Sequence, residues 1–365
     1  MCIRDRSSTE QDTGSETEQD INPFEEITEK AYAQLPPEVK KSIDLTQLRT
    51  TVKNAKSFAV LLTGKSGSGK STLTNGILGT NVAKEGDDLK RCTTEVKEFT
   101  FRKGEVDVKV WDSPGLQDGT VHQADYLMQM KDKCTNRDLT MYCLRITDGR
   151  FVRGDDNPDV LAMKKLTATF GTEFWANTII VLTFSNTLEA FHVEWEDLPR
   201  QEKAAEFKKF LDKWRDAIRE ILIEDIEVSK EIVDNMRIVP AGHYKKPHLP
   251  GNKFWLSTLW FQCLGSITSE EGKLALWKMN ASRLKGENAV TGYDFKKEAE
   301  EQPLVVTETN YAGVLVRGAV TTTAAGSGAT FGAALGSVAG PVGTVTGALI
   351  GGLFGFVVGV TVSIF

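Results

Sequence analysis

The sequence predicts an α/β protein with a doubly wound, mainly parallel β-sheet, followed by a hydrophobic helical hairpin at its C-terminal end. Short apolar runs of strand length alternate with segments of helical periodicity, which is typical of parallel strands joined by crossover helices. A glycine-rich loop and an aspartate-bearing turn directly follow two of these strands. In such folds, ligands bind at the carboxyl ends of the strands. The hairpin is predicted because residues 318–365 contain no charged side chain.

The predicted elements follow one another closely along the chain. The expected strands are mostly apolar and end at a turn: residues 57–63, 106–111, 139–146, 177–183 and 236–240. The expected helices carry apolar residues at helical spacing: residues 71–78, 121–133, 155–170 and 254–267. The domain that they form is expected over residues 24–272, with a linker over 273–317.

Residues 64–71 read Gly-Lys-Ser-Gly-Ser-Gly-Lys-Ser and match the phosphate-binding pattern G-x-x-x-x-G-K-[ST]. Its glycines let successive backbone N–H groups point at one anion. The Lys70 ammonium can then reach the β- and γ-phosphates, and the Ser71 hydroxyl can bind Mg²⁺. A strand before the loop and a helix after it disfavour a mere flexible turn. The predicted phosphate-binding residues are Gly64, Lys65, Ser66, Gly67, Ser68, Gly69, Lys70, Ser71 and Thr72.

A second motif, Asp112-Ser113-Pro114-Gly115, follows the strand at 106–111. Alone, such a sequence indicates only a turn. About 40 residues after the phosphate loop, with one strand-like segment between, it supports a nucleotide site. Asp112 is expected to hold Mg²⁺, and the Gly115 N–H to sense the γ-phosphate. Thr93 and Thr94 both offer a hydroxyl for the remaining Mg²⁺ position, and we favour Thr94.

Composition excludes several other classes. The net charge of −6 and the pI near 5.5, without a basic stripe, argue against a nucleic-acid partner. The five cysteines form no C-x-x-C pair, which indicates reduced thiols and a cytosolic compartment. No signal peptide is expected. Residues 1–23 are predicted to be an acidic, disordered N-terminus, and the first six resemble translated sequencing-adapter sequence.

A helical insertion is predicted at about residues 189–234. Its apolar residues recur at three- and four-residue steps, so that one face is apolar. Core packing is the simplest interpretation of this face, and a partner-binding surface is the alternative.

The segment 318–365 predicts attachment to a membrane. Glycines recur every four residues at positions 328–340 and again at 343–359, the small-x-x-x-small spacing used between membrane helices. Residues 318–340 and 342–365 are each long enough to cross a bilayer, at about 1.5 Å per residue. A single anchor is the alternative to a hairpin. The nucleotide domain would face the cytosol, and the identity of the membrane is left open.

With these motifs placed, residues 55–270 resemble the GTPases of the immunity-associated (GIMAP, AIG-type) and chloroplast-import-receptor (Toc) family. The resemblance depends on both nucleotide motifs, with Asn75–Gly79 and Leu116 completing them, and on Gly149-Arg150-Phe151 followed by Phe170-Gly171 and the strand at 179–183. It implies a P-loop G domain that binds GTP or GDP with Mg²⁺.

The guanine-reading motif departs from the usual N/T-K-x-D. The chain has Thr183-Phe184-Ser185-Asn186, and a neutral amide selects guanine less sharply than a carboxylate. Thr183 and Asn186 are the predicted base contacts from this motif. Ala241 and Gly242 are predicted to contribute the backbone loop that closes over the base. GTP is favoured over ATP chiefly by the resemblance.

Hydrolysis is expected to be slow, because Leu116 stands where fast GTPases have a water-orienting glutamine. Gln117 and Arg150 are the catalytic candidates, although Arg150 could equally form a surface ion pair. The resemblance implies activation by nucleotide-dependent homodimerisation across the nucleotide face. The alternatives are a membrane scaffold that binds nucleotide with little hydrolysis and an ATP-preferring P-loop enzyme.

Overall fold

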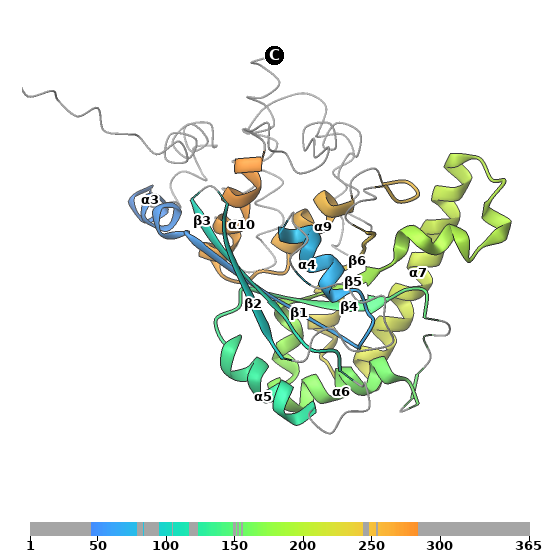
Figure 1. Ribbon diagram of the computed structural model, residues 1–365, viewed down its shortest axis with the longest axis horizontal. Coiled ribbons are helices and arrows are strands. Elements are labelled where there is room, and N and C mark those ends of the chain that lie inside the picture. The colour runs from blue at the N-terminus through green and yellow to red at the C-terminus, as the bar shows by residue number, and fades with distance from the viewer. Residues whose placement is uncertain are drawn as a thin grey trace, which may run out of the picture.

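The computed structural model describes residues 45–78, 83, 95–103, 105–116, 123–148, 151, 153–154, 156–243, 248–252 and 255–283. Figure 1 shows a central twisted β-sheet with helices on both sides. This is the α/β architecture with a mainly parallel sheet that the sequence predicts.

The sheet has six strands in the order β2-β3-β1-β4-β5-β6. Only β2 runs antiparallel to its neighbour, and the other neighbouring strands pair in parallel. The bounds are β1 Ser57–Thr63, β2 Lys97–Lys103, β3 Val106–Asp112, β4 Leu139–Arg145, β5 Thr178–Thr183 and β6 Ile238–Pro240. The strands expected from apolar runs are therefore confirmed. β2 alternates between half-buried and exposed residues, which is typical of an edge strand.

The helices form two layers around the sheet. On one side lie α3 (Leu45–Asn54), α4 (Lys70–Leu78), α9 (Trp255–Leu264) and α10 (Glu270–Arg283). On the other lie α5 (Gln123–Lys133) and α6 (Pro158–Phe170). β4 and β5 are buried almost throughout because helices cover both faces of the sheet. Every central strand can therefore be apolar along its length.

The connection from β5 to β6 is helical. It contains the short 3₁₀ helices η2 (Ser185–Ala190) and η3 (Val193–Trp195), then α7 (Arg200–Glu224) and α8 (Lys230–Asn235). Another 3₁₀ helix, η1 (Thr172–Asn177), leads into β5. The apolar face of α7 is buried in the core: Phe207, Leu211, Trp214, Ile218, Ile221 and Leu222. The predicted apolar face at 189–234 therefore packs inside the domain, in line with the core interpretation.

The C-terminal boundary of the domain differs from the expected one. α10 runs past residue 272, where the domain was expected to end, and packs against α3 and β1. Lys278 is only 1% exposed, and its ammonium donates a hydrogen bond to the Val52 carbonyl. The expected boundary was too early because the mixed polar sequence of α10 lacks a clear apolar stripe.

None of the helices in the described part of the chain combines the length and apolar character needed to cross a membrane. The predicted N-terminal segment 1–23 and the predicted membrane segment 318–365 both lie outside the described residues.

Candidate functional site

The phosphate loop connects β1 to α4, as the motif predicts. Gly64 and Gly69 have positive φ angles of 141° and 81°, which favour glycine. An added Cβ on Gly64 would lie 2.4 Å from the Cys143 carbonyl oxygen. Ser71 and Thr72 occupy the first turn of α4, so the loop ends at a helix N-terminus, where backbone N–H groups favour an anion. The local chain therefore has the form of a phosphate-binding loop.

Lys70 lies within the curve of this loop and is 6% exposed. Its ammonium donates to the carbonyl oxygens of Gly64, at 3.2 Å, and Lys65, at 2.8 Å. These bonds hold a buried positive charge at the mouth of the loop, where a phosphate oxygen would meet it.

Asp112 ends β3 beside the start of α4. The Ser71 hydroxyl donates to its Oδ2 at 2.8 Å, while its buried Oδ1 has no hydrogen-bond partner among the described residues. Burial raises the pKa of Asp112, although the Lys70 ammonium and the Ser71 hydroxyl oppose this shift. A hydroxyl and a buried carboxylate with an unused oxygen fit the oxygen ligands that Mg²⁺ prefers, directly or through water.

The two motifs are bonded to each other. The Ser66 N–H donates to the Leu116 carbonyl at 3.2 Å, and the Leu116 N–H donates to the Gly64 carbonyl at 3.1 Å. Between these bonds, a Cβ on Gly115 would lie 2.4 Å from Ser66 Cα. Only glycine allows this approach, so a shift of either loop would displace the other.

The predicted base-binding residues come together at the ends of β5 and β6. The Asn186 Oδ1 accepts a hydrogen bond from the His243 backbone N–H at 3.0 Å, and Gly242 lies against the same side chain. The Ser185 N–H donates to the Ala241 carbonyl, which ties the two loops together. The Thr183 hydroxyl instead donates toward the Ser68 carbonyl at 2.7 Å, within the phosphate loop. A base contact by Thr183 therefore stays a prediction.

The sequence pattern predicts no role for Phe184. It adopts a left-handed conformation with φ 60°, which is uncommon outside glycine. Its ring edge lies 3.0 Å from the position of a Cβ on Gly69, and the Arg145 guanidinium lies 4.3 Å from the ring centroid. The ring therefore stands between the phosphate loop and the base loop.

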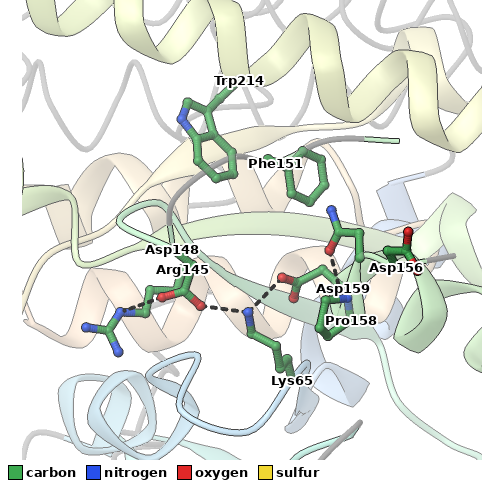
Figure 2. A pocket seen from close by; sticks show the side chains of 9 residues that line it. Lys65, Arg145, Asp148, Phe151, Asp156, Pro158, Asp159 and Trp214 are labelled. Atoms are coloured by element: carbon green, nitrogen blue, oxygen red, sulfur yellow. Dashed lines mark hydrogen bonds and ion pairs between the residues drawn. The ribbon is translucent and has the colours of Figure 1, made fainter. Parts of the chain in front are cut away.

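Lys65 points away from the phosphate loop toward carboxylates on the opposite wall of a pocket (Figure 2). Its ammonium lies 2.6 Å from Asp148 Oδ2 and 3.0 Å from Asp159 Oδ2. Burial opposes the charge of Lys65, but the two carboxylates outweigh it and raise its pKa. Burial also raises the pKa of Asp159, and the Lys65 ammonium offsets only part of that shift. Lys65 thus anchors the loop to the start of α6.

The pocket beside Lys65 has a volume of about 150 Å³. Phe151 and Trp214 form one wall, with ring centroids 5.1 Å apart in a stacked arrangement. The sequence does not predict a role for Asp148 or Asp159, because their contact with Lys65 joins residues more than 80 positions apart.

The remaining predicted site residues, Thr93, Thr94, Gln117 and Arg150, lie outside the described residues. Their assignments to metal binding and catalysis stay predictions.

Comparison with known proteins agrees with this geometry. Residues 58–233 match the model of the AIG1 family. The translocase of chloroplast 34 homolog from Chlamydomonas reinhardtii is 31% identical over 167 residues, 42% of this chain and 41% of that protein. The chain thus spans less than half of this relative. Residues 58–233 thus form an AIG1-type domain that is similar to part of a Toc-type translocase.

One solved structure shows the same fold. A structure of the chloroplast translocon components atToc33 and psToc159 is 21% identical, with a TM-score of 0.50, covering 66% of this chain and 94% of its own. Toc33 from Arabidopsis thaliana in complex with GDP and Mg²⁺ is 21% identical, with a TM-score of 0.47, covering 68% of this chain and 95% of its own.

Replacing Gly115 with alanine should loosen the contact between the two motifs. The new methyl group would overlap the Ser66 backbone, and overpacking of this kind costs about 1–3 kcal/mol. Urea unfolding should show that loss, and titration with a fluorescent GDP analogue should show weaker binding. Gly265→Ala is the control, since its methyl group would meet the flexible Arg237 side chain at 3.1 Å and the Gln262 carbonyl oxygen at an ordinary contact distance of 3.5 Å. If both variants lose the same stability in urea and bind the GDP analogue equally well, the close approach of Gly115 to Ser66 would be contradicted.

The raised pKa of Asp159 predicts a specific pH dependence. The folded state binds the Asp159 proton more tightly than the unfolded state, so this group stabilises the fold less as pH rises above about 4. The free energy of unfolding of wild type minus that of Asp159→Asn should fall from pH 4 toward neutrality. Asp156→Asn, at the same pocket, is the control for lost charge. If the difference in unfolding free energy between wild type and Asp159→Asn rises with pH, the ion pair with Lys65 outweighs the effect of burial on Asp159.

Proposed function

We propose that this chain is a guanine-nucleotide-binding switch that uses Mg²⁺. The observation that carries the proposal is the arrangement of Lys70 and Ser71 at the start of α4 beside Asp112 at the end of β3. A buried ammonium faces the phosphate position, and a hydroxyl–carboxylate pair with an unused oxygen lies beside it. Phosphate oxygens are stabilised by a positive charge such as this ammonium, and Mg²⁺ binds oxygen ligands such as this hydroxyl–carboxylate pair. The G-domain class favours guanine over adenine.

The proposed switch works through the bonded motifs. The Gly115 N–H would sense the γ-phosphate, and a shift there would reach the phosphate loop through the Ser66–Leu116 and Leu116–Gly64 bonds. Thr94, or Thr93, would complete the metal shell. Binding of GTP or GDP would thereby set the conformation of the nucleotide face.

We further propose that hydrolysis is slow in the single chain and is stimulated when two copies pair across the nucleotide face. Leu116 supports this, because it is fully buried, bonded to the phosphate loop and unable to orient water. Gln117 and Arg150 are the proposed catalytic residues. The competing proposal is a nucleotide-bound scaffold with little hydrolysis.

The proposed location is a membrane surface, with the G domain in the cytosol and residues 318–365 inserted. Support comes from the uncharged composition and glycine spacing of this segment.

Lys70→Ala should abolish tight nucleotide binding, because it removes the only buried ammonium in the described part of the phosphate loop. Titration with fluorescent GDP in Mg²⁺ should show a loss of about 100-fold or more, as expected for a lost charge-assisted contact to phosphate. Lys208→Ala, an exposed lysine on α7, should bind as wild type does. Micromolar or better affinity in Lys70→Ala would rule out the assigned phosphate site.

Turnover per chain should rise with protein concentration if pairing activates hydrolysis. GTP hydrolysis by the purified full chain, measured over a range of concentrations, tests this. Arg150→Ala should lose the concentration-dependent part without losing nucleotide affinity. Arg153→Ala is the matched control, because that guanidinium is held by Glu220, Glu224 and Asp225. Constant turnover per chain would favour the scaffold.

The membrane proposal predicts that the full chain sediments with neutral phosphatidylcholine vesicles. A double variant, Phe354→Lys and Phe356→Lys, should lose most of this binding, because charge in an inserted helix is costly. Ser7→Lys with Ser15→Lys adds the same charge near the other end and should bind as wild type does. Equal sedimentation of all three proteins would exclude insertion of this segment.

A further inference from the structure

The side chain of Lys65 leaves the phosphate loop and ends between two carboxylates (Figure 2). Its ammonium lies 2.6 Å from Asp148 Oδ2 and 3.0 Å from Asp159 Oδ2, and the side chain is only 17% exposed. An ammonium has three donors, and these carboxylates use two of them. The two contacts therefore keep the Lys65 charge behind the loop, although the Lys65 backbone belongs to the loop.

Both carboxylates are held by parts of the domain outside the phosphate loop. Asp148 Oδ1 lies 3.1 Å from Arg145 Nε, and the Asp148 N–H donates to the Arg145 carbonyl at 3.3 Å. The Asp159 N–H donates to Asn157 Oδ1 at 2.9 Å, and the Asp159 carbonyl accepts from the buried Tyr142 hydroxyl at 3.3 Å. The anchors thus belong to the turn after β4 and to the first turn of α6.

The backbone of Lys65 supports the residues that would meet a nucleotide. Its carbonyl accepts from the Lys70 ammonium at 2.8 Å and from the Ser68 N–H at 3.3 Å. Lys65 also forms an isolated parallel bridge with Leu116 of the second motif. A displacement of Lys65 would therefore move a carbonyl that holds the Lys70 ammonium in place.

We propose that Asp148 and Asp159 are positioning residues for nucleotide binding. They act through Lys65, because their hold on its ammonium fixes its carbonyl, and that carbonyl helps to aim the Lys70 ammonium at the phosphate position. The inference rests on the proposed function, since it needs a nucleotide whose phosphates meet Lys70.

Positioning and simple electrostatics predict opposite effects when these carboxylates are lost. Removing two negative charges near an anion site should by itself tighten the binding of a negatively charged nucleotide. Removing the anchors of Lys65 should weaken that binding, because the carbonyl that supports Lys70 is no longer fixed. The direction of the change therefore separates a positioning role from an ordinary charge effect.

Titration of the purified full chain with a fluorescent GDP analogue at saturating Mg²⁺ tests the proposal. The double variant Asp148→Asn with Asp159→Asn should bind about tenfold more weakly than wild type, the scale of one charge-assisted hydrogen bond. Urea unfolding checks that each protein is folded under the assay conditions. If the double variant does not fold, Asp148→Asn alone should show a weaker loss in the same direction.

The matched control is Asp156→Asn with Asp234→Asn, which removes the same charge. Asp156 lines the same pocket, but the described ion pairs of Lys65 do not include it, and Asp234 is an exposed residue of α8. This control should bind the GDP analogue at least as tightly as wild type does.

Lys65→Met should lose as much affinity as the double variant, because it removes the group that the carboxylates hold. Adding both asparagine changes to Lys65→Met should cause no further loss, since all three side chains act through one contact. If the Lys65 ammonium instead bound phosphate directly, Lys65→Met alone would weaken binding, and freeing the ammonium from its carboxylates would strengthen it.

The outcomes distinguish the inference from the proposed function. If wild type binds the GDP analogue and the double variant binds it as tightly as the control does, the inference is overturned while the proposed function stands. Losses that add in the triple variant would also overturn it. If wild type does not bind the GDP analogue in Mg²⁺, the proposed function itself fails.

Discussion

The site depends on the parallel pairing of β1 with β3. This register sets Leu62 opposite Asp112, so that both strands end at the same edge of the sheet. The phosphate loop leaves one strand end and the aspartate turn leaves the other. The Ser71–Asp112 hydrogen bond and the two backbone bonds around Leu116 can form only because those ends coincide. The strand pairing thus places the proposed phosphate position next to the proposed Mg²⁺ position.

This arrangement buries polar atoms without hydrogen-bond partners among the described residues, which lowers the stability of the fold. Buried oxygens without a hydrogen-bond partner among the described residues include Thr63 Oγ1, Ser68 Oγ, Thr74 Oγ1 and Asp112 Oδ1. Such atoms are expensive in a protein interior, and here they cluster around the phosphate loop. Bound phosphate, Mg²⁺ and ordered water are the groups that would satisfy them. Nucleotide binding should therefore stabilise the fold as well as switch it, since a ligand that binds only the folded state raises its stability.

The sequence alone predicted those features that depend on residues adjacent in the chain. Gly64–Ser71 and Asp112–Gly115 are contiguous motifs, and the buried strands β4 and β5 read as continuous apolar runs. The contacts of Lys65 with Asp148 and Asp159 were not predictable, because they join a loop to residues that only the fold brings near. The same holds for the Thr183 hydroxyl, which bonds to Ser68 O across 115 positions. The edge strand β2 lacks an apolar run, so its first and last residues could not be predicted from the sequence.

The most direct measurement is the identity and preference of the bound nucleotide. Mass spectrometry of material that co-purifies with the full chain, paired with calorimetric titration of GDP and ADP in Mg²⁺, addresses phosphate, metal and base together. The account predicts a co-purified guanine nucleotide and GDP binding that weakens when Mg²⁺ is removed, with ADP much weaker. Equal or tighter binding of ADP would contradict it, leaving a P-loop nucleotide site without the G-domain base specificity.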